Sequence, residues 1–121
     1  MNEITINGEK YIKKSEIKEM SKLNEEGFEY VVIRTDSSGV HAGYLKSRNG
    51  KVVELINSRR IWKWYGANEL CGLATIGILN IEDSCISPVQ YKIILTEAIE
   101  VLSTTEKAKN IIEGAVEWIA K

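Results

Sequence analysis

The sequence has few of the residues that build metal and redox sites. Its 121 residues include one histidine, His41, and two cysteines, Cys71 and Cys85. The cysteines are not spaced as a CxxC pair, and one histidine cannot complete a four-ligand site with them, so we expect no structural zinc ion. We also expect both thiols to stay reduced, as in a cytoplasmic protein.

Signals for secretion or membrane insertion are missing as well. The chain begins MNEIT, which is not a basic, apolar signal peptide, and no apolar run approaches membrane-spanning length. We therefore expect a cytoplasmic location and no membrane partner.

Catalytic motifs are equally scarce. Neither GxxxxGK[ST] nor GxGxxG occurs, so nucleotide hydrolysis and dinucleotide redox chemistry have no motif support. His41 is the one imidazole available as a base, and Ser38 is close to it in sequence, but a hydrolytic triad depends on geometry that spacing does not show. We therefore expect neither catalysis nor a cofactor.

Length and patterning fit one globular domain of the α+β class, since 44% of the residues are hydrophobic. Residues 1–28 are predicted to be an accessory segment, with a hairpin around Asn7-Gly8 and a helix capped by Ser15. Residues 29–121 are predicted to form a ligand-binding domain on an antiparallel β-sheet core. Its first four strands are predicted at 30–35, 40–48, 51–56 and 60–64.

The second half of the chain predicts two helices and a returning strand. Residues 67–76 indicate a short mid-chain helix, and residues 89–102 have strand character with a bend at 96–98. The sequence STTE at 103–106 matches a capping box, after which an amphipathic C-terminal helix is expected. Because Gly114 weakens an isolated helix by about 1 kcal/mol, we expect this helix to pack on the sheet or on a partner chain, in a dimer. Its apolar stripe is Ala108, Ile111, Ile112, Ala115, Val116 and Ile119.

The densest signal is the stretch 57–65, NSRRIWKWY, which holds three cations and three aromatic rings. If the stretch is extended, its side chains alternate between faces, so Arg60, Trp62 and Trp64 share one face. Guanidinium groups beside indole rings suit a ligand with negative charge and a flat π face, such as a nucleotide. The alternative is that the tryptophans fill the core and the arginines are solvated.

Positive charge is concentrated in the middle of the chain. Residues 34–63 include seven lysines and arginines against two acidic residues, although the net charge of the whole chain is −1. This pattern favours a local anion site, and we expect no DNA or RNA polymer as a partner. The alternative is that the charges scatter over both faces of a sheet and never converge.

Three ordered blocks resemble the phage-encoded Thoeris anti-defence family, small proteins known as sponges. The blocks are RTDSSGVHAG (34–43), RRIWKWYGA (59–67) and LTEAIE (95–100), and the likeness runs from about residue 30 to 118. The resemblance implies non-catalytic capture of a cyclic ADP-ribose isomer of the glycocyclic type, the signal that a Thoeris sensor makes on infection, in the cytoplasm of the infected bacterial cell. It also implies a β-rich core with C-terminal helical segments that interlock into a homodimer or higher homo-oligomer. Certain relatives also bind cyclic oligonucleotides at a separate site.

A cyclic ADP-ribose isomer requires cations for two phosphates, hydroxyl partners for two sugars and a stacking surface for adenine. On the matched blocks we predict arginines for the phosphates, serines for phosphate or ribose oxygens and tryptophans for stacking, with a histidine beside them and no metal. The predicted ligand-binding residues are Arg34, Ser37, Ser38, His41, Arg59, Arg60, Trp62 and Trp64. Asp36 departs from the family pattern and would oppose a diphosphate unless it points away.

Two other functions are consistent with the residues alone. The first is a hydrolase of the same signal that uses His41 or a carboxylate. The second is a small interaction module whose basic, tryptophan-rich strand binds RNA, DNA or a protein. A nucleic-acid partner would give binding that weakens steeply with salt, and the net charge of −1 speaks mildly against it.

Overall fold

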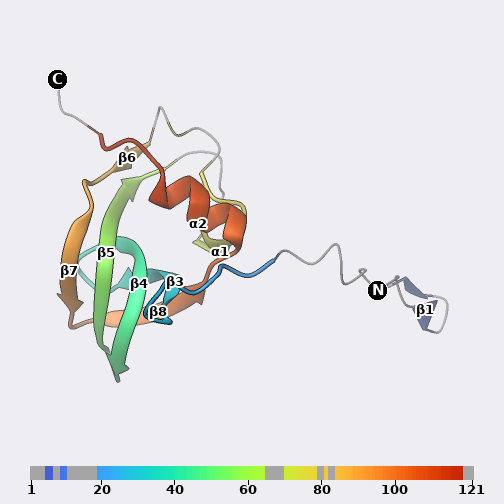
Figure 1. The fold of residues 1–121 in the computed structure, drawn as a ribbon, viewed down its shortest axis with the longest axis horizontal. Helices are drawn as coiled ribbons and strands as arrows, with labels where there is room; N and C mark the ends of the chain where they lie inside the picture. Colours follow the sequence, from blue (N-terminus) through green and yellow to red (C-terminus); the bar gives the residue numbers. More distant parts are fainter. Residues whose placement is uncertain are drawn as a thin grey trace.

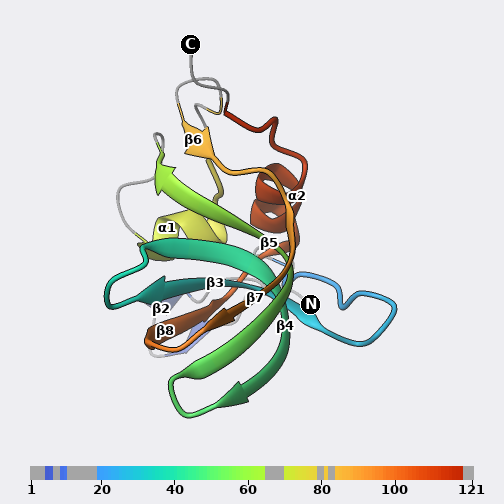
Figure 2. The same ribbon diagram turned by 90° about the vertical axis from the view of Figure 1, so that its left-hand side faces the viewer.

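The computed structural model describes residues 5–6, 9–10, 19–64, 70–78, 81 and 84–118. Its main sheet has six strands in the order β6-β5-β4-β3-β8, with β7 also paired to β5, and every pairing is antiparallel. Helices α1 and α2 lie on the same side of this sheet (Figures 1 and 2). The predicted α+β class with an antiparallel sheet core is therefore confirmed. The elements are β3 (Glu29–Thr35), β4 (Val40–Asn49), β5 (Val52–Lys63), α1 (Leu70–Thr75), β6 (Cys85–Ile86), β7 (Gln90–Leu95), β8 (Ala98–Ser103) and α2 (Glu106–Glu113).

The strands predicted at 51–56 and 60–64 are one continuous strand, β5. Asn57 has a φ of 50°, yet the strand continues through it. Opposite it, the register with β4 shifts between Ala42 and Tyr44, so the extra residue of β5 is accommodated as a bulge. The short strand β6 was not predicted, because its residues read as part of a loop over 80–87. The other predicted strands agree with the structure, including the break between β7 and β8.

Gly43 lies opposite the bulge, where β4 and β5 come unusually close. A Cβ atom at position 43 would be 2.9 Å from the Cα of Ser58. Glycine is therefore required here for lack of space, since its φ is not positive.

The central strand β3 is buried on both faces because the sheet has a hydrophobic core on each side. Tyr30 and Val32 point toward the helices and share a cluster with Ile61 and Leu73, among others. The residues that alternate with them point to the opposite face. A second hydrophobic cluster lies on that face and contains Val31, Ile33, Val53, Leu55, Leu95 and Ala98.

The second cluster exists because the sheet curls on itself. β7 pairs with β5 and β8 pairs with β3, yet only residues 96 and 97 separate β7 from β8. The two ends of the sheet must therefore meet at this corner. The N–H of Ala98 also donates to the carbonyl of Lys51, 3.0 Å away, at the start of β5. The face opposite the helices is consequently concave.

Helix α2 is shorter than the sequence predicted, and α1 ends at Thr75, one residue before its predicted end. Leu73 and Ala74 of α1 are buried as expected, and Gly77 follows it with a φ of 87°; the predicted start at 67–69 lies outside the described residues. The N-cap of α2 is Thr105, whose side chain accepts from the N–H of Ala108, so the capping-box prediction was wrong by two residues because β8 continues through Ser103.

The predicted apolar stripe runs from Ala108 to Ile119, which is beyond the end of helix α2. Helix α2 ends at Glu113 with Gly114 as its C-cap, and Ala115 and Val116 follow it without helical structure. Ile119 lies outside the described residues. Ala108 and Ile112 are the buried apolar residues of α2.

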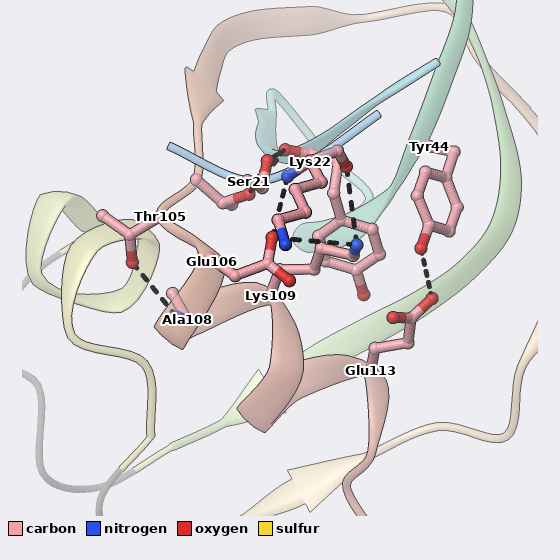
Figure 3. A network of polar contacts seen from close by, with 10 residues as sticks. Ser21, Lys22, Tyr44, Thr105, Glu106, Ala108, Lys109 and Glu113 are labelled. Atoms are coloured by element: carbon pink, nitrogen blue, oxygen red, sulfur yellow. Dashed lines mark hydrogen bonds and ion pairs between the residues drawn. The ribbon is translucent and has the colours of Figure 1, made fainter. Parts of the chain in front are cut away.

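In the N-terminal part, β1 (Thr5–Ile6) and β2 (Glu9–Lys10) form the predicted hairpin. The predicted helix does not extend over 19–24, which are not helical, and residues 11–18 lie outside the described part. Residues 19–22 instead dock where β8 meets α2 (Figure 3). The backbone N–H of Lys22 donates to Oε1 of Glu106 at 2.7 Å.

Candidate functional site

A pocket of about 540 Å³ opens on the concave face. The register of β4 and β5 pairs His41 with Arg60, which places both side chains on one face. Ser58 and Trp62 alternate with Arg60 along β5 and share that face. The described lining residues are His41, Ser58, Arg60, Trp62, Ser87, Pro88, Gln90, Lys92 and Ile93.

The rim of the pocket is a break in the sheet edge. β6 and β7 pair with the same side of β5 and are separated by residues 87–89. Pro88 has no N–H to donate, so the ladder cannot continue through it. Ser87 anchors the break, because its N–H donates to the carbonyl of Arg60 (2.9 Å) and its Oγ accepts from the N–H of Arg60 (2.7 Å).

The charged side chains in the described lining of the pocket are cations. No carboxylate is found among its described lining residues, whereas Arg60 and Lys92 are both there. Lys92 also lies 3.7 Å from Glu54. Within the described part of the chain, the Arg60 guanidinium has no hydrogen bond or ion pair, so its donors are open to an anionic ligand.

His41 forms the inner wall of the pocket with its side chain buried. Its Nε2 is 3.0 Å from the carbonyl oxygen of Ser38, which can only accept, so Nε2 carries the proton. Burial lowers the pKa of His41 below its usual value, the nearby Arg60 lowers it further, and the Ser38 carbonyl partly opposes both.

This lowered pKa predicts a pH-dependent stability. Below the ordinary histidine pKa of 6.5, the unfolded chain binds a proton that folded His41 still rejects, so the free energy of unfolding should fall as pH falls. We expect the urea midpoint of the wild type to drop more between pH 7.5 and 5.5 than that of His41→Gln. Parallel pH profiles for the two proteins would contradict the assignment.

Arg59 lies on the opposite face of β5, among the residues that contact the helices. Its Nη1 donates to the carbonyls of Ile112 at 3.0 Å and of Ala115, and its Nε donates to the carbonyl of Ser87 at 2.9 Å. The side chain is buried, and this burial lowers its pKa. Its donors are therefore occupied by main-chain carbonyls, and it does not reach the pocket.

Two other predicted residues lie together at a separate site. Arg34 and Trp64 line a second pocket of about 350 Å³, where Nη1 of Arg34 is 3.2 Å from Oε1 of Glu100. Trp64 does not share the face of Trp62, because β5 ends at Lys63 and its register with β6 shifts after Ile61. It packs beside the helix-side core.

The predicted serines belong to a loop that is already hydrogen-bonded. Ser37 Oγ donates to Glu97 at 2.7 Å, and Ser38 donates through both its N–H and its Oγ to Oγ1 of Thr35. Thr35 Oγ1 in turn donates to the carbonyl of Gly39. Ser38 therefore supports His41 behind the pocket and is not among the residues that line it.

Sequence reasoning found Arg60 and Trp62 on β5 but missed Ser58 on the same strand and the lining residues that follow β6. Ser58 was within the basic aromatic stretch and could have been found by counting alternate positions from Arg60. Gln90 and Lys92 gave no local signal, since the pairing of β7 with β5, Ser58 with Gln90 and Ile56 with Lys92, brings them beside β5. Ser87 is placed by its hydrogen bonds with the backbone of Arg60.

Among the described residues, no cluster of three or more metal-ligating side chains occurs, and no helix has the length and apolar character needed to span a membrane. No curated protein and no solved structure matches this sequence. A family model described as a domain of unknown function (DUF6948) matches residues 28–112, which include the whole of β3, β4, β5 and β8 and most of α2. Because this match covers most of the chain, the protein belongs to the DUF6948 family.

Proposed function

We propose that this protein binds and sequesters a cyclic ADP-ribose isomer of the glycocyclic type in the concave pocket, and so acts as an anti-defence sponge. The observation that carries the proposal is the arrangement of Arg60 and Trp62 side by side in a pocket whose described lining has no carboxylate. Forked guanidinium donors suit a phosphate, and an exposed indole suits a base. The resemblance in three sequence blocks supports the same ligand class.

The dimensions of the pocket support a ligand of nucleotide size. Sites for small molecules usually measure about 300 to 1,000 Å³ and combine apolar walls with a few polar groups. At about 540 Å³, this pocket has Trp62, Pro88 and Ile93 as apolar walls and two serines and a glutamine as hydrogen-bonding groups.

Sequestration without degradation is part of the proposal. A hydrolase of the same ligand would need an activated nucleophile, and Ser38 Oγ is 3.4 Å from Nε2 of His41. However, that Nε2 carries the proton donated to the Ser38 carbonyl, and the Ser38 hydroxyl is bonded to Thr35. His41 in this tautomer cannot accept the serine proton through Nε2.

The resemblance extends the proposal to assembly and location. We propose a homodimer or larger homo-oligomer in the cytoplasm of the infected bacterial cell, with the cyclic signal as its partner. A site for cyclic oligonucleotides is part of the same proposal, separate from the concave pocket.

The test is capture followed by release. The purified protein would be mixed with a cyclic ADP-ribose isomer made by an activated Thoeris sensor, and the filtrate and the heat-denatured retentate would be analysed by mass spectrometry. We expect the filtrate to be depleted and the intact isomer to be recovered after denaturation. Recovery of breakdown products alone would indicate the hydrolase, and an undepleted filtrate would contradict the proposal.

A further inference from the structure

Trp62 has an aromatic neighbour that sequence analysis did not connect with the pocket. Trp118 lies against it edge to face, with ring centroids 5.7 Å apart and planes at 89°. Both rings remain about half exposed, at 49% for Trp62 and 46% for Trp118. Trp62 lines the pocket, so Trp118 contacts a ring that the proposed ligand would use.

The segment that carries Trp118 is held in place from two sides. The N–H of Trp118 donates to the carbonyl of Ile86 in β6 at 2.9 Å. On the other side, the buried guanidinium of Arg59 binds the carbonyls of Ile112 and Ala115, where the chain leaves α2. The same guanidinium holds the carbonyl of Ser87, at the rim of the pocket.

We propose that Trp118 and Arg59 are positioning residues for base recognition: Arg59 fixes the segment 115–118, and Trp118 fixes the indole of Trp62 for stacking. This inference rests on the proposed function and specifies how the same pocket selects a ligand with a purine base. An exposed indole on a strand has several rotamers of similar energy. A T-shaped contact restricts them and leaves the flat face of Trp62 free.

According to this proposal, different residues govern binding of the phosphates and binding of the base. Arg60 is on the pocket face and would attract phosphate regardless of how Trp62 is oriented. Within the described part of the chain, the ring of Trp118 contacts that of Trp62, so removing the ring should weaken binding of the base and leave binding of the phosphates. Preorganisation of this kind raises affinity by lowering the entropy lost when the ligand binds.

The test uses calorimetry with two probes: the cyclic ADP-ribose isomer, and inorganic pyrophosphate, which has phosphates but no base. Trp118→Ala should bind the isomer about tenfold more weakly, in the range for loss of one stacking contact, and bind pyrophosphate within about twofold of wild type. Trp118→Phe should recover most of the lost affinity. Val116→Ala, on the same segment and 83% exposed, is the matched control and should bind both probes like wild type.

Arg59→Lys keeps the charge and loses the forked donors that hold segment 115–118 and the carbonyl of Ser87, so it should weaken binding of the isomer. If Arg59 acts through Trp118, Arg59→Lys should cost less affinity for the isomer in the Trp118→Ala background than in the wild type, and an equal cost in both backgrounds would contradict this coupling. Trp118→Ala leaves the buried Arg59 network intact, which keeps the test valid if Arg59→Lys does not fold.

Two results would overturn the inference while the proposed function stands. One is a Trp118→Ala protein with wild-type affinity for the isomer, and the other is an equal loss for both probes, which would indicate a general structural role. Failure of the wild type to bind the isomer would instead contradict the proposed function, and this inference with it.

Discussion

Replacing Arg60 by glutamate is expected to weaken binding of the cyclic ADP-ribose isomer by at least about 100-fold. Loss of a hydrogen bond from a charged group costs about 1.5 to 3 kcal/mol, and the new carboxylate would repel the phosphates from a pocket whose described lining has none. The side chain is exposed, so the substitution should leave the fold intact. Calorimetric titration would measure the change, and a thermal melt would verify folding.

Arg48→Glu is the matched control for that result. It makes the same change in net charge on β4, at an exposed arginine whose described contact is a 3.3 Å bond from Nε to the carbonyl of Gly50. We expect its affinity to stay within about threefold of wild type, because exposed charges farther apart than about 10 Å are largely screened at 0.1 M salt. Equal losses in the two variants would mean that net charge, and not the pocket, governs binding.

Gly43→Ala is expected to be the most destabilising single change of those considered, at about 2 to 3 kcal/mol, the upper part of the range for overpacking. The added Cβ would lie 2.9 Å from both Cα and Cβ of Ser58. Strand β5 would have to move, because Cα and Cβ of Ser58 can shift only together with the backbone. Urea denaturation would measure the loss of free energy of unfolding.

A second glycine distinguishes lack of space from the general effect of losing a glycine. Gly50, in the turn before β5, has a φ of 63° and no atom within 4 Å of its added Cβ. Asn tolerates this left-handed conformation, so Gly50→Asn should change stability by no more than about 0.5 kcal/mol, as surface substitutions usually do. A wild-type urea midpoint for Gly43→Ala would show that the two strands are not as close as described.

Local signals were sufficient to predict most of the strands. Residues 31–33 are a run of β-branched apolar residues, and β3 is indeed buried on both faces along this run. The errors came where two local patterns were both acceptable. The chain through Asn57 resembles a turn between strands, yet continuous pairing with β4 and β7 makes it a bulge within one strand. Similarly, Ser103 could cap a helix, but its pairing with Val31 keeps it in β8.

The site was only partly predictable because the curl of the sheet determines which cationic side chains line the pocket. Among the described residues, Arg60 alone of the seven basic residues between 34 and 63 lines the concave pocket. Arg34 pairs with Glu100, Lys46 lies 3.6 Å from Glu54, and Arg59 points to the other face. The charge scatter that we had considered as the alternative is therefore largely what occurs. Lys92 reaches the pocket from outside the basic stretch, through a strand pairing that composition does not encode.

The docking of residues 19–22 also determines when the domain can be completed during synthesis. Lys22 contacts Glu106, 84 positions later, and Ser21 contacts Thr104, 83 positions later. Contacts of such long sequence separation slow folding, because a large loop must close before they contribute free energy. None of them can form until the ribosome has released α2, and β3 likewise waits for its partner β8. Until β8 has been synthesised, the edge of β3 that β8 covers therefore stays unpaired. An unpaired strand edge is a template for pairing with another chain, so this interval is when we expect the protein to be most prone to association.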